Sequence, residues 1–411
     1  MTSKQRLLAA WNGKPVDHVP LTTWCFGLKA PPHLKWTRDG IDRTFWYSLR
    51  MEHLHTLPQP WTVEDDFQRV RSWQSLGLDD VLDVSVPWSA DPSTTWKDTE
   101  VPAGKMVPQY PVMIRDYQTP SGGLRHAVRK TGEDGGAGWV IQPNCVPLIE
   151  DFNIPRGVKH IVSSPSDVKA IGHLYMPPDA KARTWFAERI AKVKAFADQN
   201  GVAVQAWACF GMDAMVWLTG TEGAILLAMD EPHAFRQLLD IILKTDLARA
   251  ELAASTPGVD IVSQRGWYSS TDLWSPALFN EYTFPCIKAV ADTIHRHGKK
   301  FGYVMTTGVE KLGERLADAG VDVLYFVDPV QDKVRLEWVR EHLASRLTVV
   351  GGTNALSVQT GWKNGLGDEI KRAIDCLAPT NRFILHPVDA LFPDTPWEGV
   401  EELIKAWKQM C

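Results

Sequence analysis

The segment from Arg382 to Trp397, RFILHPVDALFPDTPW, holds the side chains of this chain that are best suited to chemistry. An apolar run ends at His386, and Asp389 follows three positions later. An imidazole and a carboxyl group at the end of a strand can move protons or bind a metal ion. Each also has an ordinary structural role, because His386 could bond a backbone carbonyl and Asp389 could cap a turn. We expect both residues to be catalytic.

The sequence around this segment alternates between apolar strands and amphipathic helices. Runs rich in Val, Ile and Leu are typical of parallel strands that are covered on both faces. Eight such strands with helices between them predict a (β/α)8 TIM barrel, a single α/β domain over residues 1–411. The expected strands are residues 18–25, 79–87, 201–211, 258–266, 299–308, 321–329, 346–354 and 382–387.

A long stretch between the second and third expected strands, residues 88–200, interrupts this alternation. Its middle part, MVPQYPVMIRDYQTPSGGLRHAVRKTG, alternates apolar and polar residues around the turn Ser121-Gly122-Gly123, which predicts an inserted β-hairpin. We expect this insertion to decorate the barrel mouth. There it could act as a lid or form a homodimer contact, and the sequence does not decide between these roles.

The carboxyl ends of the strands form the active site of a β/α barrel. Tryptophans stand at several of these ends, and an aromatic lining suits an aromatic or apolar ligand. Tyr303 on the fifth expected strand is a further catalytic candidate, and Asp328 follows the sixth. The expected substrate-binding residues are Trp24, Trp88, Trp207, Trp267 and Asn354.

Composition limits the classes of partner. The chain has a formal net charge of -5 and 44% hydrophobic residues, as in a soluble globular protein, so neither nucleic acid nor an anionic membrane is expected to bind. No apolar run approaches the roughly 20 residues that span a bilayer, and we expect a cytoplasmic protein. The six cysteines have no CxxC spacing, which predicts free thiols.

Four segments in order along the chain resemble the uroporphyrinogen decarboxylase superfamily. They are SKQRLLAAWNGKPVDHVPL, SPALFNEYTFPCIKAVADTIHRHGKK, AGVDVLYFVD and DTPWEGVEELIKAWK. The resemblance implies a β/α barrel whose site lies at the strand ends. It also implies one of two activities, porphyrinogen decarboxylation or corrinoid-dependent methyl transfer.

The decarboxylase branch implies arginines after the first strand, which bind substrate carboxylates, and a His near the end of the last strand. This chain has TTWCFGLKAPPHLKW there, with only Lys29 and Lys35 before Arg38, and it has Asp389 near the end of the last strand. A carboxylate would repel a polycarboxylate substrate. A cofactor-free decarboxylase with Asp389 or Tyr303 as proton donor is therefore the alternative hypothesis.

The methyltransferases that act on thiols resemble one another in a zinc site made by a His-x-Cys pair and a later Cys. At the matching places this chain has Tyr303-Val304-Met305 and Asp389, so a thiol substrate is not expected. An aryl methyl ether needs stabilisation of a leaving phenoxide instead. Zinc held by His386, Asp389 and Asp328 could supply it, as could an acid such as Tyr303 or a neutral Asp389.

The resemblance thus implies a methyltransferase that moves a methyl group from a small O-methylated, aromatic donor to the cobalamin of a separate corrinoid protein. In this hypothesis Gly351 and Gly352 let a corrinoid or the substrate approach the backbone closely. An alternative from another class is a catalytically silent carrier of a corrinoid or another ligand.

Overall fold

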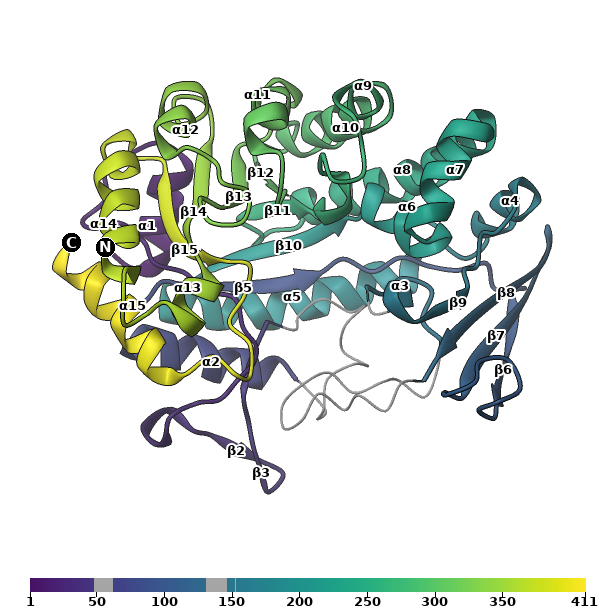
Figure 1. Cartoon of the computed structure of the whole chain (residues 1–411), viewed down its shortest axis with the longest axis horizontal. Helices are drawn as coiled ribbons and strands as arrows, with labels where there is room; N and C mark the ends of the chain where they lie inside the picture. Colours follow the sequence, from purple (N-terminus) through teal and green to yellow (C-terminus); the bar gives the residue numbers. More distant parts are fainter. Residues whose placement is uncertain (48–61, 131–145, 152) are drawn as a thin grey trace.

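A curved parallel sheet forms the centre of the protein (Figure 1). The computed structural model describes residues 1–47, 62–130, 146–151 and 153–411. Within these residues seven strands pair in the order β15-β14-β13-β12-β11-β10-β5, so all seven match expected barrel strands. They are β5 (Val81–Ser85), β10 (Ala203–Cys209), β11 (Ile261–Gln264), β12 (Lys300–Val304), β13 (Val323–Val327), β14 (Thr348–Asn354) and β15 (Phe383–Val388).

The first expected strand, residues 18–25, closes the barrel without forming a regular strand. On one side the Thr22 N–H donates to the carbonyl of Leu385 in β15 (3.0 Å). On the other side the Asp79 N–H, next to β5, donates to the carbonyl of Leu21 (2.9 Å). Pro20 has no N–H to give, which interrupts a continuous ladder here. The TIM barrel prediction is confirmed, with this segment between β15 and β5.

Helices follow the barrel strands as the periodicity predicted, and their apolar faces pack on the sheet. The region between α6 and β11 forms two helices, α7 and α8, because Pro232 begins the second one. The helices of six residues or more are α1 (Ser3–Trp11), α2 (Val63–Ser75), α5 (Ala180–Asn200), α6 (Met212–Thr219), α7 (Thr221–Asp230), α8 (Pro232–Ser255), α10 (Phe284–His295), α11 (Val309–Ala319), α12 (Leu336–His342), α13 (Ala355–Thr360), α14 (Leu366–Leu377) and α15 (Trp397–Gln409).

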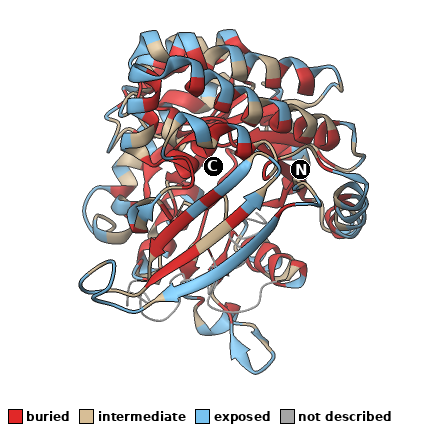
Figure 2. Ribbon diagram, turned by 90° about the vertical axis from the view of Figure 1, so that its right-hand side faces the viewer, coloured by how far each residue is buried: buried red, intermediate tan, exposed pale blue. Residues whose placement is uncertain are grey.

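The region between the second and third barrel strands contains an antiparallel sheet of the four strands β6 (Thr95–Val101), β7 (Val112–Thr119), β8 (Gly122–Arg129) and β9 (Gly157–Lys159). Strands β7 and β8 form the expected hairpin. The sheet lies at the end of the molecule away from both termini, the end toward which β5 and β10 point (Figure 1). Strand β6 is its exposed edge, whereas β7 and β8 bury several side chains (Figure 2).

The expected insertion boundary extends too far along the chain. Residues 180–200 form α5, which contacts β5 and β10 and so belongs to the barrel itself. The inserted part therefore ends before Ala180. In the part of the chain that the structure describes, no helix is both long and apolar enough to cross a bilayer.

Candidate active site

An aromatic cluster fills the carboxyl end of the barrel. Trp24 is its centre, with ring centroids 5.5 Å from Trp207, 5.9 Å from Trp267 and 4.9 Å from Phe326. The His386 ring lies 5.5 Å from that of Phe326 and completes the group. Trp24 and Trp207 are buried, while Trp267 is half-buried. Three of the four tryptophans expected at the strand ends thus meet in one place.

Phe326 is a member of this cluster that the sequence did not single out. Its φ of 75° lies in the left-handed region, which a bulky side chain rarely occupies. Such strain costs on the order of 1–3 kcal/mol and collects at functional sites. The register between β13 and β14 shifts between Tyr325 and Val327, so the irregular backbone turns the Phe326 ring toward Trp24 and His386. No pattern of residue types reveals a positive φ at a phenylalanine.

Trp88 does not join this cluster. Its ring packs on Tyr175 (5.7 Å) and Phe210 (5.8 Å), in a second apolar core around α6 and α8. The Arg249 guanidinium lies 5.5 Å from the Trp88 ring. These contacts give Trp88 a packing role between barrel and insertion, which corrects its prediction as a residue of the aromatic lining.

His386 is a buried, neutral imidazole. Its Nε2 lies 3.4 Å from the Asp389 carbonyl, which can only accept, so Nε2 carries the proton. Its Nδ1 then accepts from the Thr22 hydroxyl (3.0 Å). Burial lowers the pKa of His386 to about 4. The ring is therefore held by two partners and orients the Asp389 backbone.

The three expected metal ligands, His386, Asp389 and Asp328, do not form a metal site. Among the described residues no group of three His, Cys, Asp or Glu side chains is arranged to hold a metal ion. Asp328 accepts instead from the Val330 N–H (2.7 Å) and from the Asn354 amide (2.6 Å). Both His386 nitrogens are likewise engaged, so these residues do not fit zinc.

Asn354 and its glycine neighbours have structural roles. The Asn354 side chain caps α13 by accepting from the Leu356 N–H (2.7 Å) and donates to Asp328. A Cβ on Gly351 would lie 2.2 Å from the Val327 carbonyl, so this glycine permits close approach of β13. The interpretation of the glycine pair as a place for a corrinoid or substrate is therefore wrong for Gly351, whose neighbour is the protein's own backbone.

Tyr303 faces away from the barrel interior. A Cβ on the preceding Gly302 would meet Ser263 and Tyr325 of neighbouring strands, so Gly302 faces inward and Tyr303, one position on, faces the helices. Its hydroxyl is bonded to Ser269 (2.7 Å), and burial raises its pKa well above the usual range. The structure does not bring Tyr303 together with Asp389.

Asp389 directly follows β15 and is half-buried. Its carboxyl group is the acidic group that stands nearest in sequence to the end of the last barrel strand. Asp389 lies beside His386, whose ring is part of the aromatic cluster.

A charged cluster beside the aromatic one escaped the sequence prediction. Arg265, at the end of β11, bonds Asp213 (3.3 Å) and also Asp151 of the inserted region. Its guanidinium lies over the rings of Trp267 (4.5 Å) and Trp217 (4.7 Å). Burial raises the pKa of Asp213 to about 7, against the attraction of Arg265. Arg265 was recognisable as a strand-end residue, but its two carboxylate partners are distant in sequence.

The family model of uroporphyrinogen decarboxylase (URO-D) matches residues 148–410, more than half of the chain. The chain belongs to the uroporphyrinogen decarboxylase family. Every barrel strand from β10 to β15, with the residues of the aromatic cluster on them, lies within the matched range. No protein of curated function matches the sequence.

One solved structure supports the same fold. A methyltransferase from Methanosarcina mazei is similar over 100% of this chain and 99% of its own, with a TM-score of 0.56 and 17% identity. The 3-keto-D-glucoside 4-epimerase YcjR from E. coli is similar over 60% of this chain and 94% of its own, with a TM-score of 0.37 and 13% identity. The first similarity extends the family's barrel to the whole length of the chain.

Two arginines that follow the first expected strand of this chain, Arg38 and Arg43, lie beside the carboxylate of Asp65. Arg38 in β2 (Thr37–Arg38) bonds the Asp65 carboxylate of α2 at 2.7 Å. Arg43 is buried and lies 3.8 Å from the same carboxylate. Their charges are compensated by an internal acid.

Proposed function

We propose that the protein is a methyltransferase that takes a methyl group from a small O-methylated aromatic compound and passes it to the corrinoid of a partner protein. The observation that carries this proposal is the aromatic cluster of Trp24, Trp207, Trp267 and Phe326 at the carboxyl end of a barrel of this family. The half-buried Trp267, packed against the buried rings of Trp24 and Phe326, offers an aromatic contact that suits the ring of an aryl methyl ether. The whole-chain similarity to a methyltransferase agrees with it.

The residues favour oxygen over sulfur as the atom that loses the methyl group. Tyr303 and Met305 stand where the thiol-methylating relatives resemble one another in His and Cys, and both are fully buried. The described residues include no metal-binding group, so no step is assigned to zinc. A reduced corrinoid, when present, supplies the electron pair that takes up the methyl group.

Asp389 is the residue that we assign to the leaving oxygen. As the bond between oxygen and methyl carbon breaks, its electron pair stays on the oxygen, and a protonated Asp389 carboxyl donates its proton there. His386 positions this residue through its bond to the Asp389 carbonyl (3.4 Å). His386 is neutral and bonds the backbone of Asp389, so its role is to position this residue.

The decarboxylase alternative lacks a carboxylate-binding group at the expected place. Arg38 and Arg43 are paired with Asp65, and Asp389 adds negative charge near the end of the last strand. Among the residues of this loop that the structure describes, the arginines that could bind substrate carboxylates are thus already paired with an internal acid.

Replacement of Asp389 tests the proposal. Asp389→Asn should lower the rate of methyl transfer from a methoxyarene to free reduced corrinoid by a factor of about 10²–10⁴, the usual contribution of a general acid. Asp394→Asn is the matched control, since Asp394 is exposed on the same loop and bonds only Gln359 in the described contacts. Equal rates for both variants and the wild type would remove Asp389 from catalysis.

A further inference from the structure

Helix α7 presents apolar side chains to solvent as well as to the core. Ile225, Leu226 and Met229 are 38%, 50% and 63% exposed. With Glu222 and Asp230 they occupy positions i, i+3, i+4, i+7 and i+8, which form a single outward stripe. The inner face buries Ala224, Leu227 and Ala228. A helix that is apolar on both faces is typical of one that is covered on both sides.

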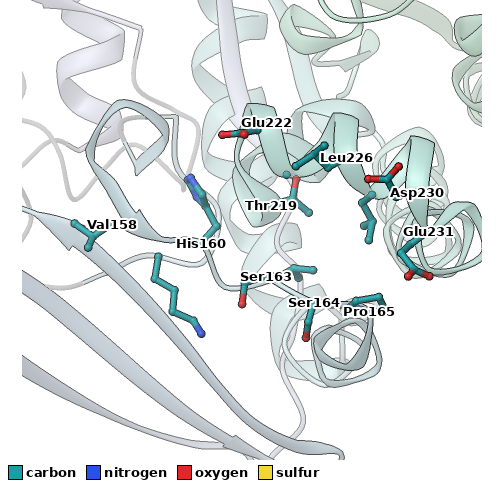
Figure 3. A pocket seen from close by; sticks show the side chains of 14 residues that line it. Val158, His160, Ser163, Ser164, Pro165, Thr219, Glu222, Leu226, Asp230 and Glu231 are labelled. Atoms are coloured by element: carbon teal, nitrogen blue, oxygen red, sulfur yellow. The ribbon is translucent and has the colours of Figure 1, made fainter.

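A hollow of about 480 Å³ opens beside this stripe. One wall is α7, with Glu222, Leu226 and Asp230, and the opposite wall is β9 with the segment after it, where Val158 and His160 lie (Figure 3). Val158 is itself 37% exposed, so the apolar surface continues across the hollow. The hollow is large enough to hold one or two side chains of a binding partner.

The charge on this hollow is acidic. Glu222, Asp230 and Glu231 line it, and none of their side chains has a hydrogen bond or ion pair within the described ranges. Lys159 is the one lysine or arginine among the lining residues, and burial lowers the pKa of His160, which keeps that ring neutral near pH 7. Free carboxylates beside exposed leucine and methionine suit a lysine or arginine whose carbon chain packs on the apolar stripe.

The position of α7 relates this surface to the active site. Helices α6 and α7 follow β10 directly, so they lie at the carboxyl end of the barrel (Figure 1). The aromatic cluster lies at the same end. Asp213 near the start of α6 is bonded to Arg265, which packs on Trp267 of the cluster. A protein bound on the outer face of α7 would therefore stand next to the barrel mouth.

We propose that the α7 surface, defined by Glu222, Ile225, Leu226, Met229 and Asp230 with the adjoining hollow, is the docking surface for the corrinoid-carrying partner. The partner contributes a basic side chain flanked by apolar ones. This proposal rests on the proposed function for the nature of the partner. Exposed apolar area of this kind, with an acidic border, is typical of protein interaction sites.

Site-specific photocrosslinking in the source cells tests the proposal. With a benzophenone side chain at Leu226, we expect a crosslinked adduct whose second protein carries a corrinoid, identified by mass spectrometry and by corrinoid absorbance. The control position is Ser345, which is exposed at the turn before β14, at the opposite end of the barrel. Crosslinks at Leu226 no stronger than at Ser345, or only to a second copy or to proteins without corrinoid, would overturn it.

Kinetics separate docking from chemistry. With the captured corrinoid protein, the double variant Glu222→Gln, Asp230→Asn and the variant Leu226→Asp should raise KM for that protein at least tenfold, while turnover of free reduced corrinoid stays unchanged. Glu314→Gln, an exposed acid on α11, should change neither. A KM for the corrinoid protein that stays unchanged in the α7 variants overturns the docking proposal. A wild-type protein that methylates no free corrinoid overturns the proposed function alone.

Discussion

His386 shows how burial decides what a titratable side chain can do. The sequence placed this residue correctly at the barrel mouth, beside Asp389 and the aromatic rings. It did not show that the Thr22 hydroxyl, from the other end of the chain, would occupy Nδ1. Thr22 reaches His386 only because the barrel closes. The local sequence therefore could not show whether His386 binds a metal ion or positions Asp389.

The neutral state of His386 predicts a pH dependence of stability. In the unfolded chain the His386 imidazole has a pKa near 6.5, whereas in the folded protein its pKa is about 4. Between these pH values the unfolded state therefore binds more protons than the folded state. The free energy of unfolding should therefore fall as pH drops from 6.5 to 4, by on the order of 3 kcal/mol from this group. Urea unfolding of wild type and His386→Phe at pH 7 and pH 4.5 measures the difference. The raised pKa of Asp213 acts in the opposite direction, but equally in both proteins. Identical pH dependence in the two would contradict the account of His386.

Arg265 ties two elements together at the scale of the fold. It joins α6 through Asp213 to the inserted region through Asp151. Arg265→Met should lower the free energy of unfolding by about 3–5 kcal/mol at pH 8, because it leaves the buried Asp213 carboxylate uncompensated. Adding Asp213→Asn should recover part of that loss. Denaturant unfolding of the two single variants and the double variant measures the coupling, and strictly additive effects would argue against the bridge.

The pair of strands β13 and β14 depends on a glycine for its spacing. Gly351 has a φ of 150°, and a Cβ there would lie 2.2 Å from the Val327 carbonyl. Gly351→Ala should therefore abolish folding or cost several kcal/mol. Gly367 in α14 has no neighbour within 4 Å of its Cβ position, so Gly367→Ala should stabilise by about 0.5–1 kcal/mol. Thermal unfolding of both variants checks this, and a Gly351→Ala protein as stable as wild type would contradict the spacing argument.

The strands and helices were predictable because the spacing of apolar residues indicates which faces of each element are buried. Seven of eight strands and the helices α8, α10, α11, α12, α14 and α15 fall where apolar alternation placed them, whereas α13 was not expected. The departures have a local and a distant cause. Pro20 interrupts the first strand because it has no N–H, and α5 belongs to the barrel because it packs on β5 and β10. Within the site, Trp24, Trp207 and Trp267 were predictable from strand ends, whereas Phe326 depends on an irregular backbone.

At the scale of the whole molecule, the barrel brings residues from both ends of the chain to one mouth. Trp24 and His386 come from its first and last barrel strands, and the inserted region reaches Arg265 from the side. The family match and the aromatic mouth together lead to the central claim, that the methyl group of an aryl methyl ether leaves from oxygen at this site.

Transfer of an isotopically labelled methyl group tests that claim most directly. The protein would be incubated with reduced corrinoid and a panel of methoxyarenes carrying a CD3 group on oxygen, and both products would be analysed by mass spectrometry. We expect the CD3 group on the corrinoid and an equal amount of the matching phenol, with at least one donor. No labelled corrinoid with any donor, together with release of CO2 from a porphyrinogen by the same preparation, would contradict the account.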